Sequence, residues 1–168
     1  MIMDEKKFIA NANIALQTPE QGLPTEIFDF VASVVPLVNV DLLIENEKHQ
    51  ILLAWRDDGE NLGWHIPGGV LRFKETFQER IQKTALREIG CQVEIDDTPL
   101  KISEIISPYQ RRGHAISLLY RCWLPTRYEI DNTLREERTD GYLQWHDSIP
   151  ELIEGQKCYQ KLLEKLCI

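Results

Sequence analysis

Apolar residues along this chain follow two different periods, which predict a mixture of strands and helices. Two runs of β-branched and apolar residues, Leu37–Ile44 and Gln50–Trp55, flank a polar turn and predict a hairpin of two strands. From Glu75 to Ile89 the apolar residues recur at helical spacing, and Gly90 follows at the position of a C-terminal capping glycine. This segment is the clearest helix in the sequence.

The rest of the chain continues the mixture and predicts the fold class. Further strands are expected at Gln92–Ile95, Lys101–Ser107, Ala115–Leu124 and Tyr142–His146, with a closing helix at Gln156–Leu166. Strands and helices in this order predict an α/β protein, a sandwich built on a mixed sheet.

The N-terminal region predicts helices only. Asp4–Gln17 carries apolar residues on one side of a helix, and Thr18–Pro24 breaks it. Thr25 is placed to cap a second helix that ends before Pro36. We therefore divide the chain into an N-terminal helical extension, residues 1–35, and a main domain, residues 36–168.

Composition limits the classes of function. The 168 residues suffice for one domain with its own core. A formal net charge of −8 disfavours a nucleic-acid partner, so an anionic nucleotide would need a metal ion or a few placed arginines. The sequence shows no signal peptide, no apolar run of membrane-spanning length and no C-x-x-C pair. We expect free thiols, no membrane contact and a cytoplasmic protein.

Glu88 is the anomalous residue of the predicted Glu75–Ile89 helix. On a helical wheel it shares the apolar arc with Phe77, Ile81, Thr84 and Ala85. The opposite, solvated arc carries Glu79, Arg80, Lys83 and Arg87. A buried carboxylate must be paired, hydrogen-bonded or bound to a metal. The helix alone favours a structural salt bridge or a cap interaction for Glu88.

The glycine turn before this helix changes that balance. Pro67-Gly68-Gly69 follows a strand and lets backbone groups approach a ligand closely. Gly69, five residues, Glu75, seven residues and then Lys83–Cys91 resemble the Nudix box of the Nudix hydrolase family. The chain departs from the family's pattern at Thr84 and Arg87, where the box carries glutamates that help to hold divalent metal.

The resemblance implies a Nudix fold, which is an α/β/α sandwich around a mixed β-sheet, and a metal-dependent hydrolase. It places Mg²⁺, with Mn²⁺ as an alternative, on the Gly68 carbonyl and the Glu88 carboxylate. Magnesium takes an octahedron of oxygen ligands, which substrate phosphates and waters would complete. With two glutamates replaced, we expect this box to hold one metal and not a cluster.

One branch of the family, the GDP-mannose mannosyl hydrolases, lacks the same two glutamates. Pro36–Asn46 and Leu52–Arg56 resemble its first two strands. That branch attacks the anomeric carbon, releases GDP and pairs through its N-terminal part. The resemblance therefore implies a small-molecule nucleotide-sugar substrate and a homodimer. It also implies that Asp41 contacts the nucleotide or sugar and that Arg56 stabilises the departing diphosphate.

The general base is where the chain departs most from this branch. Arg138 and Thr139 stand where the branch has a Gln-His pair, and threonine is no base near neutral pH. The candidates to replace it are Glu137, Asp140, His114 and His65. Tyr142 is a candidate for substrate binding. The run Arg111-Arg112-Gly113-His114 fits either a phosphate clamp or a solvated hairpin tip.

Structural interpretations compete with these roles. Asp41 also fits an ion pair with a lysine across the sheet, and Arg56 a solvated strand end. His65 fits a packed structural histidine, and Tyr142 fits the core as well as a ligand site.

Three hypotheses of function result. The leading one is a Mg²⁺-dependent hydrolase of a nucleotide sugar, GDP-mannose-like, or a related nucleoside diphosphate derivative. The second is a degenerate, non-catalytic Nudix domain that binds a nucleotide or sugar, with the Arg87 guanidinium supplying the charge of the metal. The third, conventional pyrophosphohydrolysis at phosphorus, needs a further carboxylate from Glu79, Glu136 or Glu137.

Overall fold

Two β-sheets form the centre of the computed structural model, which describes residues 5–17, 22–107 and 113–167. A five-stranded mixed sheet contains β1 (Leu37–Ile44), β4 (Gly68–Val70), β5 (Glu94–Ile95), β6 (Lys101–Ile106) and β7 (His114–Trp123). A three-stranded antiparallel sheet contains β2 (Ile51–Asp57), β3 (Leu62–His65) and β8 (Leu143–His146). In the mixed sheet β1 runs parallel to β7, while β4, β5 and β6 are antiparallel to their neighbours.

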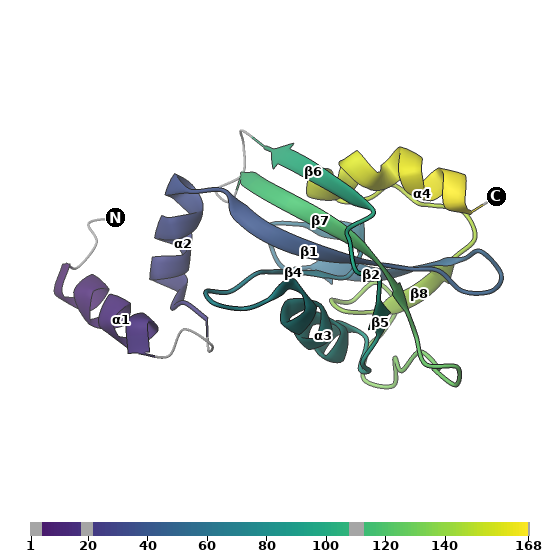
Figure 1. The fold of residues 1–168 in the computed structure, drawn as a ribbon, viewed down its shortest axis with the longest axis horizontal. Coiled ribbons are helices and arrows are strands. Elements are labelled where there is room, and N and C mark those ends of the chain that lie inside the picture. Colours follow the sequence, from purple (N-terminus) through teal and green to yellow (C-terminus); the bar gives the residue numbers. More distant parts are fainter. Residues whose placement is uncertain (1–4, 18–21, 108–112, 168) are drawn as a thin grey trace.

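Helices cover both faces of the mixed sheet (Figure 1). Val40 and Leu42 of β1 belong to one core cluster with Ile81 of α3 (Phe77–Glu88). The alternate residue Leu43 belongs to a second cluster with Leu163, because successive strand residues face opposite sides. Leu163 lies in α4 (Gln160–Leu166), which continues the 3₁₀ helix η2 (Glu154–Tyr159). The predicted α/β sandwich with a mixed sheet is confirmed.

The predicted hairpin of β1 and β2 is wrong in one respect. The two strands are consecutive, and Glu45 and Ile51 form an isolated antiparallel bridge at the turn, but β1 and β2 then belong to different sheets. Both strands are apolar on both faces, as the buried pair Leu52 and Leu53 illustrates. A solvated hairpin would expose one face to water, so these strands instead diverge and are covered on both sides.

The N-terminal helices are α1 (Glu5–Gln17) and α2 (Thr25–Val34). The Phe8 and Phe30 rings pack edge to face with their centroids 5.6 Å apart. In Figure 1, α1 lies outside the sandwich, and α2 lies between α1 and the first residues of β1. Thr25 is not the cap: Pro24 takes that position, with no side-chain capping bond. Part of the predicted break, residues 18–21, lies outside the described residues.

No helix in the described part of the chain is both long and apolar enough to span a membrane.

Hydrogen bonds between residues close in sequence cap helix α3 at both ends. The Thr76 hydroxyl accepts a bond from the Glu79 amide, and the Glu79 side chain accepts one from the Thr76 amide, forming a capping box. At the other end Gly90 has a φ of 87°, and its amide donates to the Ala85 carbonyl at 3.0 Å. These two ends fix the position of Glu88 relative to the glycine turn.

Candidate functional site

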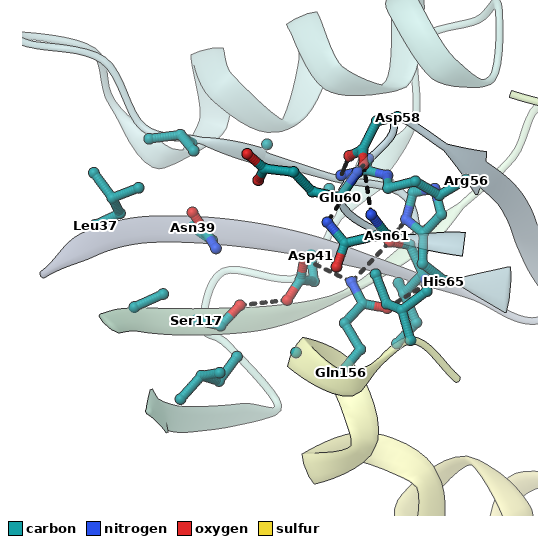
Figure 2. A pocket seen from close by; sticks show the side chains of 18 of the residues that line it. Leu37, Asn39, Asp41, Arg56, Asp58, Glu60, Asn61, His65, Ser117 and Gln156 are labelled. Atoms are coloured by element: carbon teal, nitrogen blue, oxygen red, sulfur yellow. Dashed lines mark hydrogen bonds and ion pairs between the residues drawn. The ribbon is translucent and has the colours of Figure 1, made fainter. Parts of the chain in front are cut away.

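An open cavity of about 200 Å³ lies where the two sheets, the glycine turn and the start of η2 meet (Figure 2). Asn39 and Asp41 of β1 both face it, because alternate residues of a strand point the same way. Polar groups form much of its wall; they are Asn39, Asp41, Arg56, Asp58, Glu60, Asn61, His65, Ser117 and Gln156. Phe28, Leu37, Val70 and Ile105 are among the apolar residues of the lining. The cavity can therefore accept a ligand with both a charged and an apolar part.

Asp41 is buried on the cavity floor and is held by neutral donors. The Ser117 and Tyr159 hydroxyls donate to its Oδ2, the latter at 3.0 Å, and the Gln156 amide donates to Oδ1 at 3.4 Å. Burial raises the pKa of Asp41 from 3.8 to about 6, although the hydroxyl bonds oppose the rise. The lysine partner considered from the sequence is replaced by hydroxyl and amide groups.

Asp41 is expected to make stability fall as pH rises. Between pH 3.8 and about 6 the folded protein holds a proton at Asp41 that the unfolded chain releases. The contribution of Asp41 to the free energy of unfolding is therefore fully present below pH 3.8 and is lost as the pH rises through about 6. Relative to the wild type, Asp41→Asn should gain roughly 3 kcal/mol in free energy of unfolding between about pH 4 and about pH 8. Urea unfolding at several pH values measures this, and a difference that does not change with pH contradicts it.

The two glycines of the turn let the backbone lie against this acid and against α3. Gly68 of β4 is registered opposite Asp41 of β1, and a Cβ at position 68 would collide with the Asp41 carboxylate. A Cβ at Gly69 would come within 2.6 Å of the Thr84 hydroxyl oxygen. Both positions therefore require glycine because of close approach.

Glu88 brings the glycine turn and helix α3 together. The Gly68 amide donates to Glu88 Oε2 at 3.2 Å. Arg87 Nη2 donates to Glu88 Oε1 at 2.6 Å and to the Gly68 carbonyl at 3.3 Å. Burial raises the pKa of Glu88, and the charges of Arg87 and Arg56 act against that rise. The two oxygen groups expected to bind metal thus converge on a single guanidinium nitrogen.

The oxygen atoms around Glu88 show what kind of metal site this chain could form. Within the described residues no group of three or more His, Cys, Asp or Glu side chains could hold a metal ion. The Gly68 carbonyl and the Glu88 carboxylate nevertheless offer hard oxygen donors at one point. These two donors fit one divalent metal ion that takes its other ligands from outside the chain, and they do not fit a cluster of metals.

Glu75, the first acid of the box, has a structural role. Its carboxylate accepts two bonds from Arg80, both at 2.7 Å, and one from Lys83 at 2.8 Å. The Arg72 amide donates to it at 3.0 Å. These bonds outweigh the effect of desolvation and lower the pKa of Glu75 to about 2.

The predicted solvent-exposed and buried faces of helix α3 were wrong at two positions. Arg80, expected on the exposed face, is buried, and Phe77, expected on the buried face, is exposed.

Arg56 and His65 both line the cavity, with different properties. Arg56 is half-buried, and its Nη1 lies 3.7 Å from the Asp58 carboxylate. His65 is buried, and its Nδ1 lies 2.8 Å from the Ile66 carbonyl oxygen. Desolvation, assisted by the charge of Arg56, lowers the pKa of His65 to about 3, so the ring is neutral near pH 7. His65 thus has the properties of the packed, structural alternative.

The four other candidates do not line the cavity. His114 begins β7 and lies 3.5 Å from the Glu104 carboxylate. Glu137 is exposed, the Asp140 carboxylate accepts the Asp57 amide at 3.0 Å, and the Tyr142 ring packs 6.4 Å from Trp64. The segment containing the last three folds against β2 and not over the cavity.

The positions that align with the Gln-His pair are also engaged elsewhere. Arg138 lies over the Trp55 ring at 5.7 Å, and the Thr139 hydroxyl donates to the Glu136 carbonyl. Arg111 and Arg112, considered as a phosphate clamp, lie outside the described residues.

Several cavity residues were not selected from the sequence. Asn39 stands two residues before Asp41, so strand alternation could have identified it. Asp58, Glu60 and Asn61 follow Arg56 in what the sequence showed only as a polar loop. Ser117 and Gln156 reach the site from β7 and η2, and only the tertiary fold brings them there.

A comparison with protein families matches most of the chain. The NUDIX domain matches residues 35–163. The low-salt glycan biosynthesis protein Agl8 of Haloferax volcanii is 33% identical over 79 residues, which are 46% of this chain and 50% of that protein. The chain therefore spans about half the length of this relative.

Two solved structures share the fold at low sequence identity. A UDP-X diphosphatase has a TM-score of 0.60 and 20% identity, over 98% of this chain and 81% of that one. A MutT NUDIX hydrolase from Burkholderia pseudomallei has a TM-score of 0.58 and 19% identity, over 79% of this chain and 98% of that one.

Proposed function

The chain belongs to the Nudix hydrolase family, and we propose that it hydrolyses a nucleotide sugar of the GDP-mannose type with one Mg²⁺ ion. The observation that carries this proposal is the pair of oxygens from Gly68 and Glu88, which meet at one cation position beside a cavity with a polar wall. Agl8, a relative over about half its own length, is named for glycan biosynthesis, and that name supports an activated sugar as substrate.

The distribution of polar groups supports a diphosphate with a sugar attached. Among the described residues, Arg56 is the cationic side chain of the cavity lining, and it would neutralise the departing diphosphate. Asn39 Oδ1 is buried with no hydrogen-bond partner among the described residues, so it would accept a bond from a hydroxyl or amino group of the ligand. A bound Mg²⁺ ion would supply positive charge to the phosphate oxygens.

Water attack at the anomeric carbon breaks the bond between the sugar and the diphosphate oxygen, and it needs a base to take one proton from the water. Asp58 is unsuited, because its carboxylate accepts bonds from Glu60 and Asn61 amides that lower its pKa. The Glu60 carboxylate takes part in no hydrogen bond or ion pair among the described residues, and it lines the cavity (Figure 2). We therefore assign the base to Glu60.

Glu60→Gln is expected to lower kcat by about 10²-fold, the usual contribution of a general base. Glu137→Gln is the matched control, because Glu137 is also an exposed loop glutamate but does not line the cavity. Steady-state kinetics of both variants decide between the two glutamates. Equal activity of Glu60→Gln and the wild type, or a loss confined to Glu137→Gln, removes Glu60 from the mechanism.

A second candidate function is favoured by the contact between Arg87 and Glu88. A guanidinium at the cation position is what a non-catalytic domain would need to bind an anionic nucleotide or sugar phosphate without metal. In that case the protein would act as a binding module of the same family.

Product analysis tests the proposal directly. Purified protein is incubated with a panel of nucleotide sugars and Mg²⁺, and free sugar and phosphate-containing products are followed separately. Free sugar plus nucleoside diphosphate is the expected result. A nucleoside monophosphate plus sugar phosphate would establish conventional pyrophosphohydrolysis instead. Absence of turnover together with metal-independent nucleotide binding would establish the binding module.

A further inference from the structure

Arg87 contacts both oxygen groups of the proposed metal site. Its Nη2 atom contacts Glu88 Oε1 at 2.6 Å and the Gly68 carbonyl oxygen at 3.3 Å. The Glu88 side chain is only 14% exposed, whereas that of Arg87 is 55% exposed. The carboxylate is therefore fixed in place, and the guanidinium reaches it from the solvent side.

The other cations of the helix are engaged elsewhere. Arg80 and Lys83 both bond to Glu75, and neither contacts Glu88 among the described residues. Arg56 lies 3.7 Å from the Asp58 carboxylate, and among the described residues it forms no ion pair with Glu88. Among the described residues, Arg87 is thus the cation in direct contact with the Glu88 carboxylate, while the charge of Arg56 acts on it without such a contact.

A metal ion and the Arg87 guanidinium cannot use these oxygens together. Both would have to sit within bonding distance of Glu88 Oε1 and of the Gly68 carbonyl, and two positive charges at that separation repel each other. We infer that Arg87 holds the cation position in the ligand-free protein and must be displaced before a divalent metal binds. This inference rests on the proposed metal site and goes beyond it, because it makes Arg87 an internal competitor that weakens metal binding.

A direct metal titration tests the inference without any substrate. Metal-free protein is titrated with Mn²⁺, and free Mn²⁺ is followed by electron paramagnetic resonance. Arg87→Ala should bind Mn²⁺ at least about tenfold more tightly than the wild type, because the competing cation is gone. Arg87→Lys, which keeps the charge but loses the planar fork, should fall between them. Lys83→Ala is the matched control. Lys83 is an exposed cation of the same helix, but it bonds to Glu75 and not to Glu88. The Mn²⁺ affinity of this variant should equal that of the wild type.

The outcomes separate this inference from the proposed function. Tighter binding by Arg87→Ala but not by Lys83→Ala supports the competition, even if no nucleotide sugar is turned over. Affinity that is unchanged or weaker in Arg87→Ala, or raised equally in Lys83→Ala, overturns it, even if hydrolysis is found. Adding Glu88→Gln to Arg87→Ala should abolish the gain, which ties the effect to this carboxylate. Thermal unfolding of each variant confirms that the fold is kept, as expected for a half-exposed side chain.

Discussion

Replacing Glu88 with glutamine should lower metal-dependent turnover by about 10³-fold, the upper range for removing a charged group that stabilises the reacting substrate. Glutamine keeps the size of the side chain and an oxygen for the Gly68 amide, which donates to Glu88 Oε2. It removes the negative charge that a divalent cation needs. The loss should appear in kcat/KM at saturating Mg²⁺, and the melting temperature should change little, because the variant also removes a buried charge.

Glu79→Gln is the control for this experiment. Glu79 lies on the same helix, but its carboxylate accepts bonds from Thr76 at the N-terminal end, and glutamine is an equivalent capping residue. We expect wild-type kinetics from this variant. If instead Glu79→Gln loses activity and Glu88→Gln keeps it, the metal site lies elsewhere and the conventional mechanism, which needs a further carboxylate, regains support.

The elements and the position of Glu88 could be predicted because they depend on local sequence. The helix from Phe77 to Glu88 repeats its apolar residues at helical spacing and carries its own capping groups at both ends. The same periodicity placed Glu88 under apolar neighbours, and the glycine turn at fixed spacing explained why an acid is there. The existence and ends of this helix could be predicted because its periodicity and its capping groups lie within the segment itself.

The predicted bases Glu137, Asp140 and His114 do not line the cavity, and their positions depend on contacts that are distant in sequence. Glu137 and Asp140 were selected by alignment to a loop, and a loop's path depends on distant contacts. Here the Asp57 amide bonds to the Asp140 carboxylate across 83 residues of sequence and holds that segment against β2. His114 begins β7, which pairs with the preceding strand β6 but also with the distant strand β1, where Leu37 is registered opposite Ala115. Only the folded chain shows that these groups do not face the cavity.

Arg80 shows a different limit of sequence reasoning. A helical wheel recognises one buried face and assigns the other side to solvent, so Arg80 was expected on the surface. The segment between Gly69 and α3 folds over that side and brings Glu75 to it, which leaves Arg80 only 4% exposed. A helical wheel of α3 cannot show this covering segment, because Glu75 lies before Phe77, the first residue of the helix.

Arg80→Ala should therefore be among the most destabilising single changes, costing about 3–5 kcal/mol in free energy of unfolding. It leaves the Glu75 carboxylate, which is 5% exposed, with Lys83 as its remaining cation, and the Lys83 side chain is 52% exposed. Urea denaturation measures the loss. Lys83→Ala removes the exposed partner of the same carboxylate and should cost no more than about 1 kcal/mol.

The acid limb of the stability curve provides an independent check of the same pair. The pKa of Glu75 is lowered from 4.5 to about 2 in the folded protein, so its contribution to stability is complete above pH 4.5 and is lost as pH falls toward 2. The difference between wild type and Arg80→Ala should shrink over that range. A constant difference would mean that Arg80 stabilises the fold by packing alone.

Replacing Glu75 and Arg80 together by apolar residues of similar size should recover much of the loss in free energy of unfolding, because the penalty comes from leaving one charge buried without its partner. Of these two acids of the box, Glu75 would then stabilise the fold, and Glu88 would bind the metal.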